Sequence, residues 1–158
     1  MKKISLFSWI YSLMGVIMCS ILFSFSTMMP GAHSFQVYLD SKLVIDQYVN
    51  SKMAAPTLFV DPAENHNQLI VKYNECGRTV TGRTITIKDD NNKVLRAWRF
   101  EGATTGYEDP MAFRVKDITA LKQKGSNVLK LYYSSKEFPE GQQIANLVIT
   151  NDAETALR

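Results

Sequence analysis

Apolar and polar residues alternate in short runs through most of the chain after residue 34, which is the pattern of strands that bury one face. Turn-forming Asp, Asn, Gly and Pro residues separate the runs. The predicted strands cover residues 35–39, 43–45, 57–60, 68–73, 84–88, 93–100, 113–115, 128–133 and 144–149. Short strands with frequent turns predict an all-β domain, an antiparallel β-sandwich or jelly roll.

The clearest local prediction is a hairpin over residues 84–100. Ile85 and Ile87 alternate with polar neighbours, as a half-buried strand requires. The sequence Asp-Asp-Asn-Asn at residues 89–92 tolerates the positive backbone angles of a tight reversal. On the returning strand, alternation places one set of side chains on a common face: Val94, Arg96, Trp98 and Phe100.

Three connections complete the predicted domain. Residues 40–42, with the sequence Asp-Ser-Lys, predict a short turn between the first two strands. Residues 101–110 are polar and contain glycine, and we expect them to form the longest loop without regular structure. Asp117 is expected to cap one short helical turn near residues 118–123, which Gly125 ends.

The first 34 residues have a different pattern. Two lysines at residues 2–3 precede an apolar run without charges over residues 4–29. A Pro-Gly pair at residues 30–31 breaks a helix, and Ala-His-Ser at residues 32–34 places small side chains at positions −3 and −1 of a signal-peptidase site. This order predicts a signal peptide helix, referred to below as the leader, over residues 1–34.

Cleavage of the leader is expected between Ser34 and Phe35, which leaves residues 35–158 as a single domain. An uncleaved anchor is the alternative, because residues 4–29 are long enough to span the ~30 Å hydrocarbon core of a membrane. In both cases the domain is expected to be exported, to the periplasm, the cell surface or the medium.

Charge and cysteine content narrow the range of partners. The chain has 18 basic and 15 acidic side chains, a net charge of +3, of which the leader lysines contribute two. The remaining charge gives no reason to expect a nucleic acid as partner, and contact with a membrane is expected only through an uncleaved N-terminal segment.

Because Cys19 leaves with the leader, Cys76 has no partner for an intramolecular disulfide. We expect Cys76 to be a small buried side chain at a strand end.

Side chains for catalysis are sparse after the leader. Cys76 and His66 are the cysteine and the histidine found there, and their spacing does not place them together as nucleophile and base. A zinc site needs three or four suitable ligands, and the sequence has no phosphate-binding glycine loop. We therefore predict no catalytic residue, no metal and no cofactor. The alternative is a small secreted hydrolase that uses the loop carboxylates of Glu108 and Asp109.

Aromatic side chains provide the candidate ligand contacts. Trp98 and Tyr107 are the two we select, because aromatic rings stack on the apolar faces of sugars. Arg96 lies two positions from Trp98 on the same strand face and is expected to stack on its ring. The competing interpretation places most aromatic rings in the core of the sandwich.

One segment resembles a known family. Its first part is Asp117-Ile118-Thr119-Ala120-Leu121, and its second part is Gly125-Ser126-Asn127-Val128-Leu129. It resembles a signature of galactose-binding-like jelly-roll domains, in which a short helical turn leads to a core strand. The strand and turn at residues 35–42 also resemble those of these domains. The resemblance implies a jelly roll and favours a carbohydrate-related role.

These observations together predict an exported, non-catalytic β-sandwich module of the cell envelope or the exterior. Its expected partner is a carbohydrate or an envelope protein. An enzyme is the less favoured interpretation.

Overall fold

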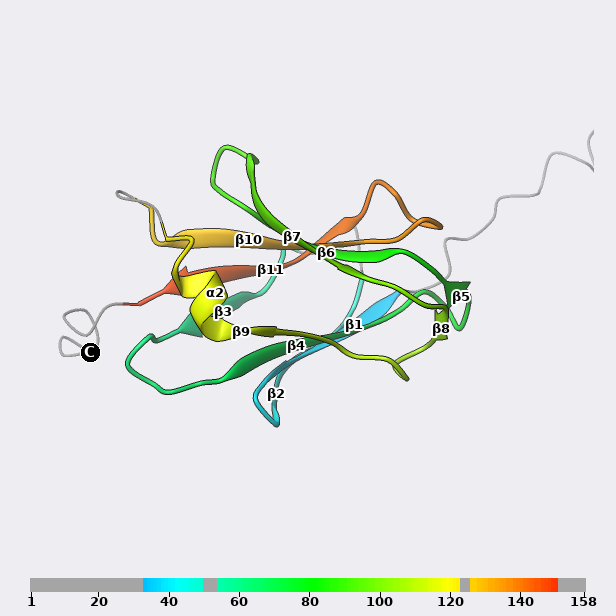
Figure 1. The fold of residues 1–158 in the computed structure, drawn as a ribbon, viewed down its shortest axis with the longest axis horizontal. Helices are drawn as coiled ribbons and strands as arrows, with labels where there is room; N and C mark the ends of the chain where they lie inside the picture. The colour runs from blue at the N-terminus through cyan, green and yellow to red at the C-terminus, as the bar shows by residue number, and fades with distance from the viewer. Residues whose placement is uncertain (1–32, 50–53, 123–125, 151–158) are drawn as a thin grey trace, which may run out of the picture. The chain divides into compact units, whose positions relative to one another are not determined.

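The computed structural model describes residues 33–49, 54–122 and 126–150. These residues form a mostly β domain with two main sheets, consistent with the predicted β-sandwich (Figure 1). Residues 1–32 lie outside the described residues, so the signal peptide and its anchor alternative stay predictions.

The first sheet has four antiparallel strands in the order β2-β1-β4-β9. Their bounds are Ser34–Leu39 for β1, Lys42–Tyr48 for β2, Gln68–Asn74 for β4 and Met111–Arg114 for β9. The predicted turn between β1 and β2 is confirmed, and Asp40 adopts a positive φ of 54° there. The β1–β2 pair is therefore a local hairpin, whereas β4 and β9 join it from distant parts of the chain.

The second sheet has five strands in the order β3-β11-β10-β6-β7. Their bounds are Thr57–Val60 for β3, Arg83–Lys88 for β6, Val94–Phe100 for β7, Val128–Ser134 for β10 and Gln142–Ile149 for β11. Strand β3 runs parallel to β11, so the expectation of a wholly antiparallel sandwich is wrong at this edge. The reason is topological: after β2 the chain changes sheets and reaches β3 in the direction of β11.

The hairpin predicted over residues 84–100 is confirmed as β6 and β7. Asp89 organises its turn, because its carboxylate Oδ1 accepts backbone N–H groups of Asn91 and Lys93, both at 2.9 Å. Asn92 has the expected positive φ of 64°. The polar turn residues therefore act through their side-chain acceptors and through their tolerance of left-handed backbone.

A third, very small sheet pairs β5 (Thr79–Val80) with β8 (Thr104–Thr105). The expectation that residues 101–110 lack regular structure is therefore wrong. A two-residue strand is too short to produce an alternating pattern, and its partner lies 24 or more positions away in sequence. The two strands are also joined through their side chains, with 2.9 Å between the hydroxyl oxygens of Thr79 and Thr105.

The core lies between the two main sheets, where alternate side chains of each strand meet. Ile85 and Ile87 of the predicted hairpin are fully buried. Burial of an aliphatic side chain of this size contributes about 1.5–3 kcal/mol relative to exposure. The other large apolar side chains that are fully buried are Leu69, Met111, Ile118, Leu129, Leu131, Tyr133, Ile144, Leu147 and Ile149.

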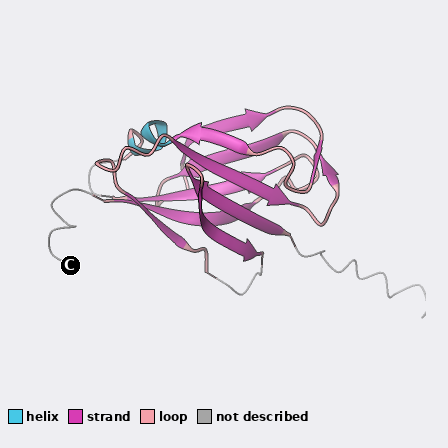
Figure 2. Ribbon diagram, turned by 90° about the horizontal axis from the view of Figure 1, so that it is seen from below, coloured by secondary structure: helices cyan, strands magenta, loops and turns pink. Residues whose placement is uncertain are grey.

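The one helix among the described residues is α2 (Val115–Thr119), at one end of the strands (Figure 2). It begins before the predicted turn at residues 118–123, and Asp117 is not its cap. Arg114 holds the N-cap position, but its side chain makes no capping hydrogen bond to the helix backbone; its guanidinium instead donates two 3.0 Å hydrogen bonds to the Asp117 carboxylate. The predicted position is wrong because the chain passes directly from β9 into the helix at the buried residue Val115.

Candidate functional site

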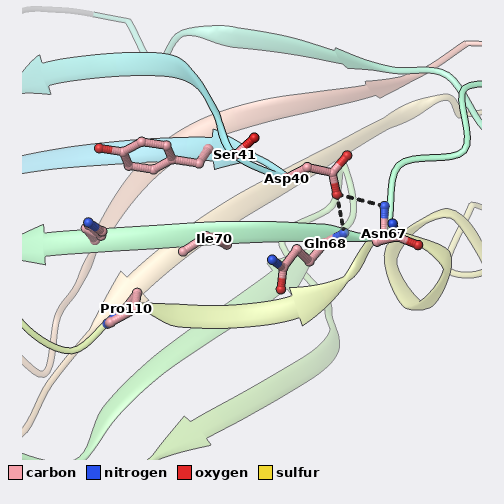
Figure 3. A pocket seen from close by; sticks show the side chains of 8 residues that line it. Asp40, Ser41, Asn67, Gln68, Ile70 and Pro110 are labelled. Atoms are coloured by element: carbon pink, nitrogen blue, oxygen red, sulfur yellow. Dashed lines mark hydrogen bonds between the residues drawn. The ribbon is translucent and has the colours of Figure 1, made fainter.

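A groove of about 740 Å³ lies on the outer face of the four-stranded sheet, the face that points away from the core (Figure 3). Strand alternation creates this face. Val37, Leu39, Leu69 and Val71 point inward, so the residues between them point outward. The groove is lined by Tyr38, Asp40, Ser41, Asn67, Gln68, Ile70, Lys72 and Pro110.

The floor of the groove combines an aromatic ring with a positive charge. Tyr38 of β1 lies directly opposite Ile70 of β4, and its hydroxyl donates a 2.9 Å hydrogen bond to Gln36 Oε1. Lys72 Nζ lies 5.2 Å from the centre of the Tyr38 ring. Among the described residues, Lys72 forms no salt bridge. Its ammonium group instead contacts the face of the Tyr38 ring, as a cation–π pair does.

Asp40 shapes one end of the groove. Its carboxylate Oδ1 accepts the backbone N–H groups of Asn67 at 2.9 Å and Gln68 at 3.1 Å (Figure 3). Its own N–H donates to the Gln68 carbonyl oxygen at 2.8 Å. Asp40 therefore fixes the β1–β2 turn against the start of β4, and positions the amide side chains of Asn67 and Gln68 beside the groove.

His66 bridges two carboxylates next to this end of the groove. Its Nδ1 is 2.8 Å from Asp40 Oδ2, and its Nε2 is 2.8 Å from Glu64 Oε2. A neutral imidazole has one N–H, so only the protonated ring donates to both carboxylates. Hydrogen bonds with Asp40 first and Glu64 second raise the pKa of His66 above its ordinary value. The His66 hydrogen bond is likewise the main reason why the pKa of Asp40 is lowered.

The aromatic residues predicted to contact ligand lie elsewhere. Trp98 is half-buried and stacks on Phe113 with 4.8 Å between ring centres. The guanidinium of Arg96 lies 5.1 Å from the Trp98 ring, as expected. The hydroxyl of Tyr107 donates a 2.7 Å hydrogen bond to Ser34 Oγ. Neither Trp98 nor Tyr107 lines the groove, and their ligand role stays a prediction.

The loop carboxylates of the hydrolase alternative differ in their surroundings. Glu108 is exposed, while Asp109 pairs with Arg83, whose side chain is only 2% exposed. The Arg83 guanidinium donates to the Asp109 carboxylate and, at 2.6 Å, to its backbone carbonyl. A buried cation needs such a partner, so the Asp109 carboxylate is committed to the fold. This arrangement gives the hydrolase alternative no support.

Cys76 is exposed, so the expectation of a buried side chain is wrong. Strand β4 ends at Asn74, and Cys76 then takes a left-handed conformation with φ of 56°. A turn follows, in which the N–H of Gly77 donates to Asn74 Oδ1 at 2.8 Å. Cys76 also has the outward parity of Ile70 and Lys72, because the buried positions along this stretch are Leu69, Val71, Tyr73 and Glu75. The described residues contain no group of three or more His, Cys, Asp or Glu side chains suited to a metal ion.

Glu75 is a buried polar residue, with 3% of its surface exposed, that the local sequence pattern does not reveal. Its Oε1 accepts hydrogen bonds from the hydroxyls of Tyr133 at 2.9 Å and Ser135 at 2.6 Å. Tyr73 stacks on Tyr133 with 3.8 Å between ring centres, and burial, as the largest cause, raises the pKa of both phenols. Glu75 therefore links the end of β4 to β10 in the opposite sheet.

The groove residues were missed for a different reason. Tyr38 and Lys72 occupy ordinary outward positions in predicted strands, so each has the pattern of a solvated face. Their proximity depends on the pairing of β1 with β4, which begins 34 positions later in the chain. The one available indication was the aromatic ring of Tyr38 at a position that alternation directs outward.

No protein-family model matches the chain, and no curated protein does. No helix formed by the described residues is long and apolar enough to cross a membrane.

Proposed function

We propose that the chain is an exported, non-catalytic, jelly-roll-like module that binds carbohydrate in the groove of the four-stranded sheet. One observation carries the proposal: an outward-facing Tyr38 ring and the ammonium of Lys72, which forms no salt bridge with the described residues, lie in a groove of about 740 Å³. The ring supplies a flat apolar surface for a sugar ring. The ammonium group donates to hydroxyl or carboxylate oxygens.

The other polar groups in the groove suit the same class of ligand. Ser41 carries a hydroxyl, and Asn67 and Gln68 carry amides, so each side chain both donates and accepts hydrogen bonds. Sugar hydroxyls also do both. A few fixed polar groups around an apolar surface are typical of small-molecule sites.

Two sequence features support the same proposal. The leader pattern supports export, which brings the domain to the compartments where glycans are exposed. The segment from Asp117 to Leu129 supports a jelly roll through its resemblance to galactose-binding-like domains. In the structure, α2 precedes core strand β10 along this segment, which agrees with the helical turn and core strand of that resemblance.

A glycan array probed with the exported protein, followed by titration calorimetry, tests the proposal. Tyr38→Ala removes the stacking surface and is expected to weaken glycan binding at least tenfold, which corresponds to about 1.4 kcal/mol. Tyr38→Phe keeps the ring and is expected to retain most of the affinity.

Tyr48→Ala is the matched control, because Tyr48 is 73% exposed and does not line the groove. It is expected to bind like the parent chain. Circular dichroism shows whether each variant is folded. The proposal is wrong if no glycan binds at millimolar concentration, or if Tyr38→Ala and Tyr48→Ala weaken binding equally.

A further inference from the structure

The five-stranded sheet carries positive charge without negative charge. Its strands β3, β6, β7, β10 and β11 contain no Asp or Glu residue. Alternate side chains of these strands point into the core, so those between them point outward, and Lys88, Arg99 and Lys130 are among the outward ones. The outward side of these five strands is called the basic face below. The four-stranded sheet differs, because its strand β2 carries Asp46.

The strand register gathers the three cations around one aromatic ring. Lys88 of β6 lies directly opposite Lys130 of β10. Arg99 of β7 lies opposite Thr84, which is four positions from Lys88 on β6. At a rise of ~3.3 Å per residue, the row of Arg99 is therefore about 13 Å along the strands from the lysine pair. Tyr132 of β10 lies in the row between, with Lys88 Nζ 4.0 Å from the centre of its ring.

The positive charge of this face is not neutralised within the domain. Among the described residues, none of the three cations forms a salt bridge. Lys130 Nζ donates at 3.0 and 2.9 Å to a backbone carbonyl and an amide oxygen of the β6–β7 turn, both of which are neutral. The carboxylates of that turn, Asp89 and Asp90, accept hydrogen bonds from backbone N–H groups and from a hydroxyl. Like charges directly opposite each other destabilise a sheet, so an anion bound across Lys88 and Lys130 would relieve their repulsion.

We propose that the basic face binds an anionic polysaccharide, a glycan whose sugars carry carboxylate or sulfate groups. A polymer fits better than a small anion, because a small anion reaches only one of the two charged rows. The Tyr132 ring between the rows supplies an apolar surface for a sugar ring. The guanidinium of Arg99 pairs with both oxygens of a carboxylate, and the lysine ammonium groups attract either kind of anion.

The same face is poorly suited to other occupants. A second copy docked across a two-fold axis would bring its own cations against these. A bilayer needs large apolar anchors beside the cations, whereas the neighbours of Tyr132 on the adjacent strands are Thr86 and Gln143. Their hydroxyl and amide groups suit the hydroxyls of sugars. The basic face lies on the other sheet from the groove and is a second site.

Binding of the full chain to three soluble polymers, measured by titration calorimetry at low and high salt, tests the proposal. Dextran sulfate, polygalacturonate and neutral dextran separate sulfate, carboxylate and uncharged sugars. At least one anionic polymer is expected to bind, more weakly as salt screens the charges. The proposal is overturned if neither anionic polymer binds at low salt, or if dextran binds as tightly as dextran sulfate. Binding to phosphatidylglycerol vesicles without binding to the anionic polymers overturns it in favour of a membrane surface.

Substitutions on the basic face locate the site. The triple variant Lys88→Gln, Arg99→Gln and Lys130→Gln is expected to weaken polymer binding by about tenfold or more, because it removes the charge of both rows. Arg99→Gln alone changes one exposed side chain on an edge strand and is expected to weaken binding about threefold. Circular dichroism shows whether each variant is folded.

A second triple variant removes the same net charge from exposed positions outside this face: Lys42→Gln, Arg78→Gln and Lys116→Gln. It is expected to bind the polymers within about twofold of the parent chain, and equal losses for the two triple variants overturn the proposal. Tyr38→Ala is expected to leave polymer binding unchanged, because Tyr38 lies in the groove of the other sheet. Failure of the groove and failure of the basic face are therefore distinguishable.

Discussion

The two ends of strand β4 hold carboxylates in opposite ways. At the start of β4, Glu64 and Asp40 of the β1–β2 turn lie at the surface, and their carboxylates share the imidazole ring of His66. Just after β4, Glu75 is buried and accepts hydrogen bonds from two neutral hydroxyls, those of Tyr133 and Ser135. The first arrangement depends on a titrating group with a raised pKa, whereas the second depends on hydroxyls that stay protonated at neutral pH.

The two ends of β4 are expected to respond to different perturbations. Solvent screens the surface cluster at His66, so its net contribution to stability is small and depends on pH. Solvent does not reach Glu75, so each hydroxyl that loses its acceptor there stays unsatisfied. The buried end is therefore expected to be sensitive to substitution, and the exposed end to pH.

Glu75→Leu is expected to have the largest effect. It leaves the hydroxyls of Tyr133 and Ser135 without their acceptor, and lowers the free energy of unfolding by about 2–4 kcal/mol. Urea denaturation measures the change. Glu64→Leu is the counterpart at the exposed end and is expected to stay within about 0.5 kcal/mol of the parent chain. Equal losses for the two variants would contradict the comparison.

Tyr133→Phe is expected to have an intermediate effect. It removes one of the two donors to Glu75 but keeps the ring that stacks on Tyr73, so stability falls by about 1–2 kcal/mol. Tyr132→Phe is a matched control on the neighbouring position, where the hydroxyl donates to Gln143 at 3.2 Å outside the core. That variant is expected to change stability by less than about 0.5 kcal/mol in the same urea series. If Tyr132→Phe lost as much stability as Tyr133→Phe, the hydrogen bond from Tyr133 to Glu75 would contribute no more to stability than a hydrogen bond outside the core.

Local patterns predicted the elements whose partners are close in sequence. The β1–β2 and β6–β7 hairpins follow from alternation and turn residues alone. The parallel pairing of β3 with β11 and the two-residue strands β5 and β8 do not, because long-range topology decides them.

The same limit applies to the polar residues that matter most. In sequence, Glu75 and Arg83 look like surface charges, and only the packing of distant strands buries them. The groove likewise exists only because β1 pairs with β4. His66 was visible as the one histidine after the leader, but its carboxylate partner Asp40 lies 26 positions away in another turn.

The smallest expected effect is the pH dependence that His66 contributes. Its pKa is raised in the folded state above the ordinary value of 6.5, so its contribution is complete below pH 6.5 and is lost as the pH rises through the folded pKa. The groups around it are Asp40 and Glu64, which favour the charged ring, and Lys116 of α2, which lines the same recess. Because His66 is partly exposed, we expect a change below about 1 kcal/mol. Urea denaturation between pH 5.5 and pH 8.5 on the parent chain and on His66→Gln measures it, and the difference between the two profiles isolates the contribution of His66. The parent chain is expected to lose stability relative to His66→Gln as the pH rises, and parallel profiles would show that the imidazolium bridge does not stabilise the fold.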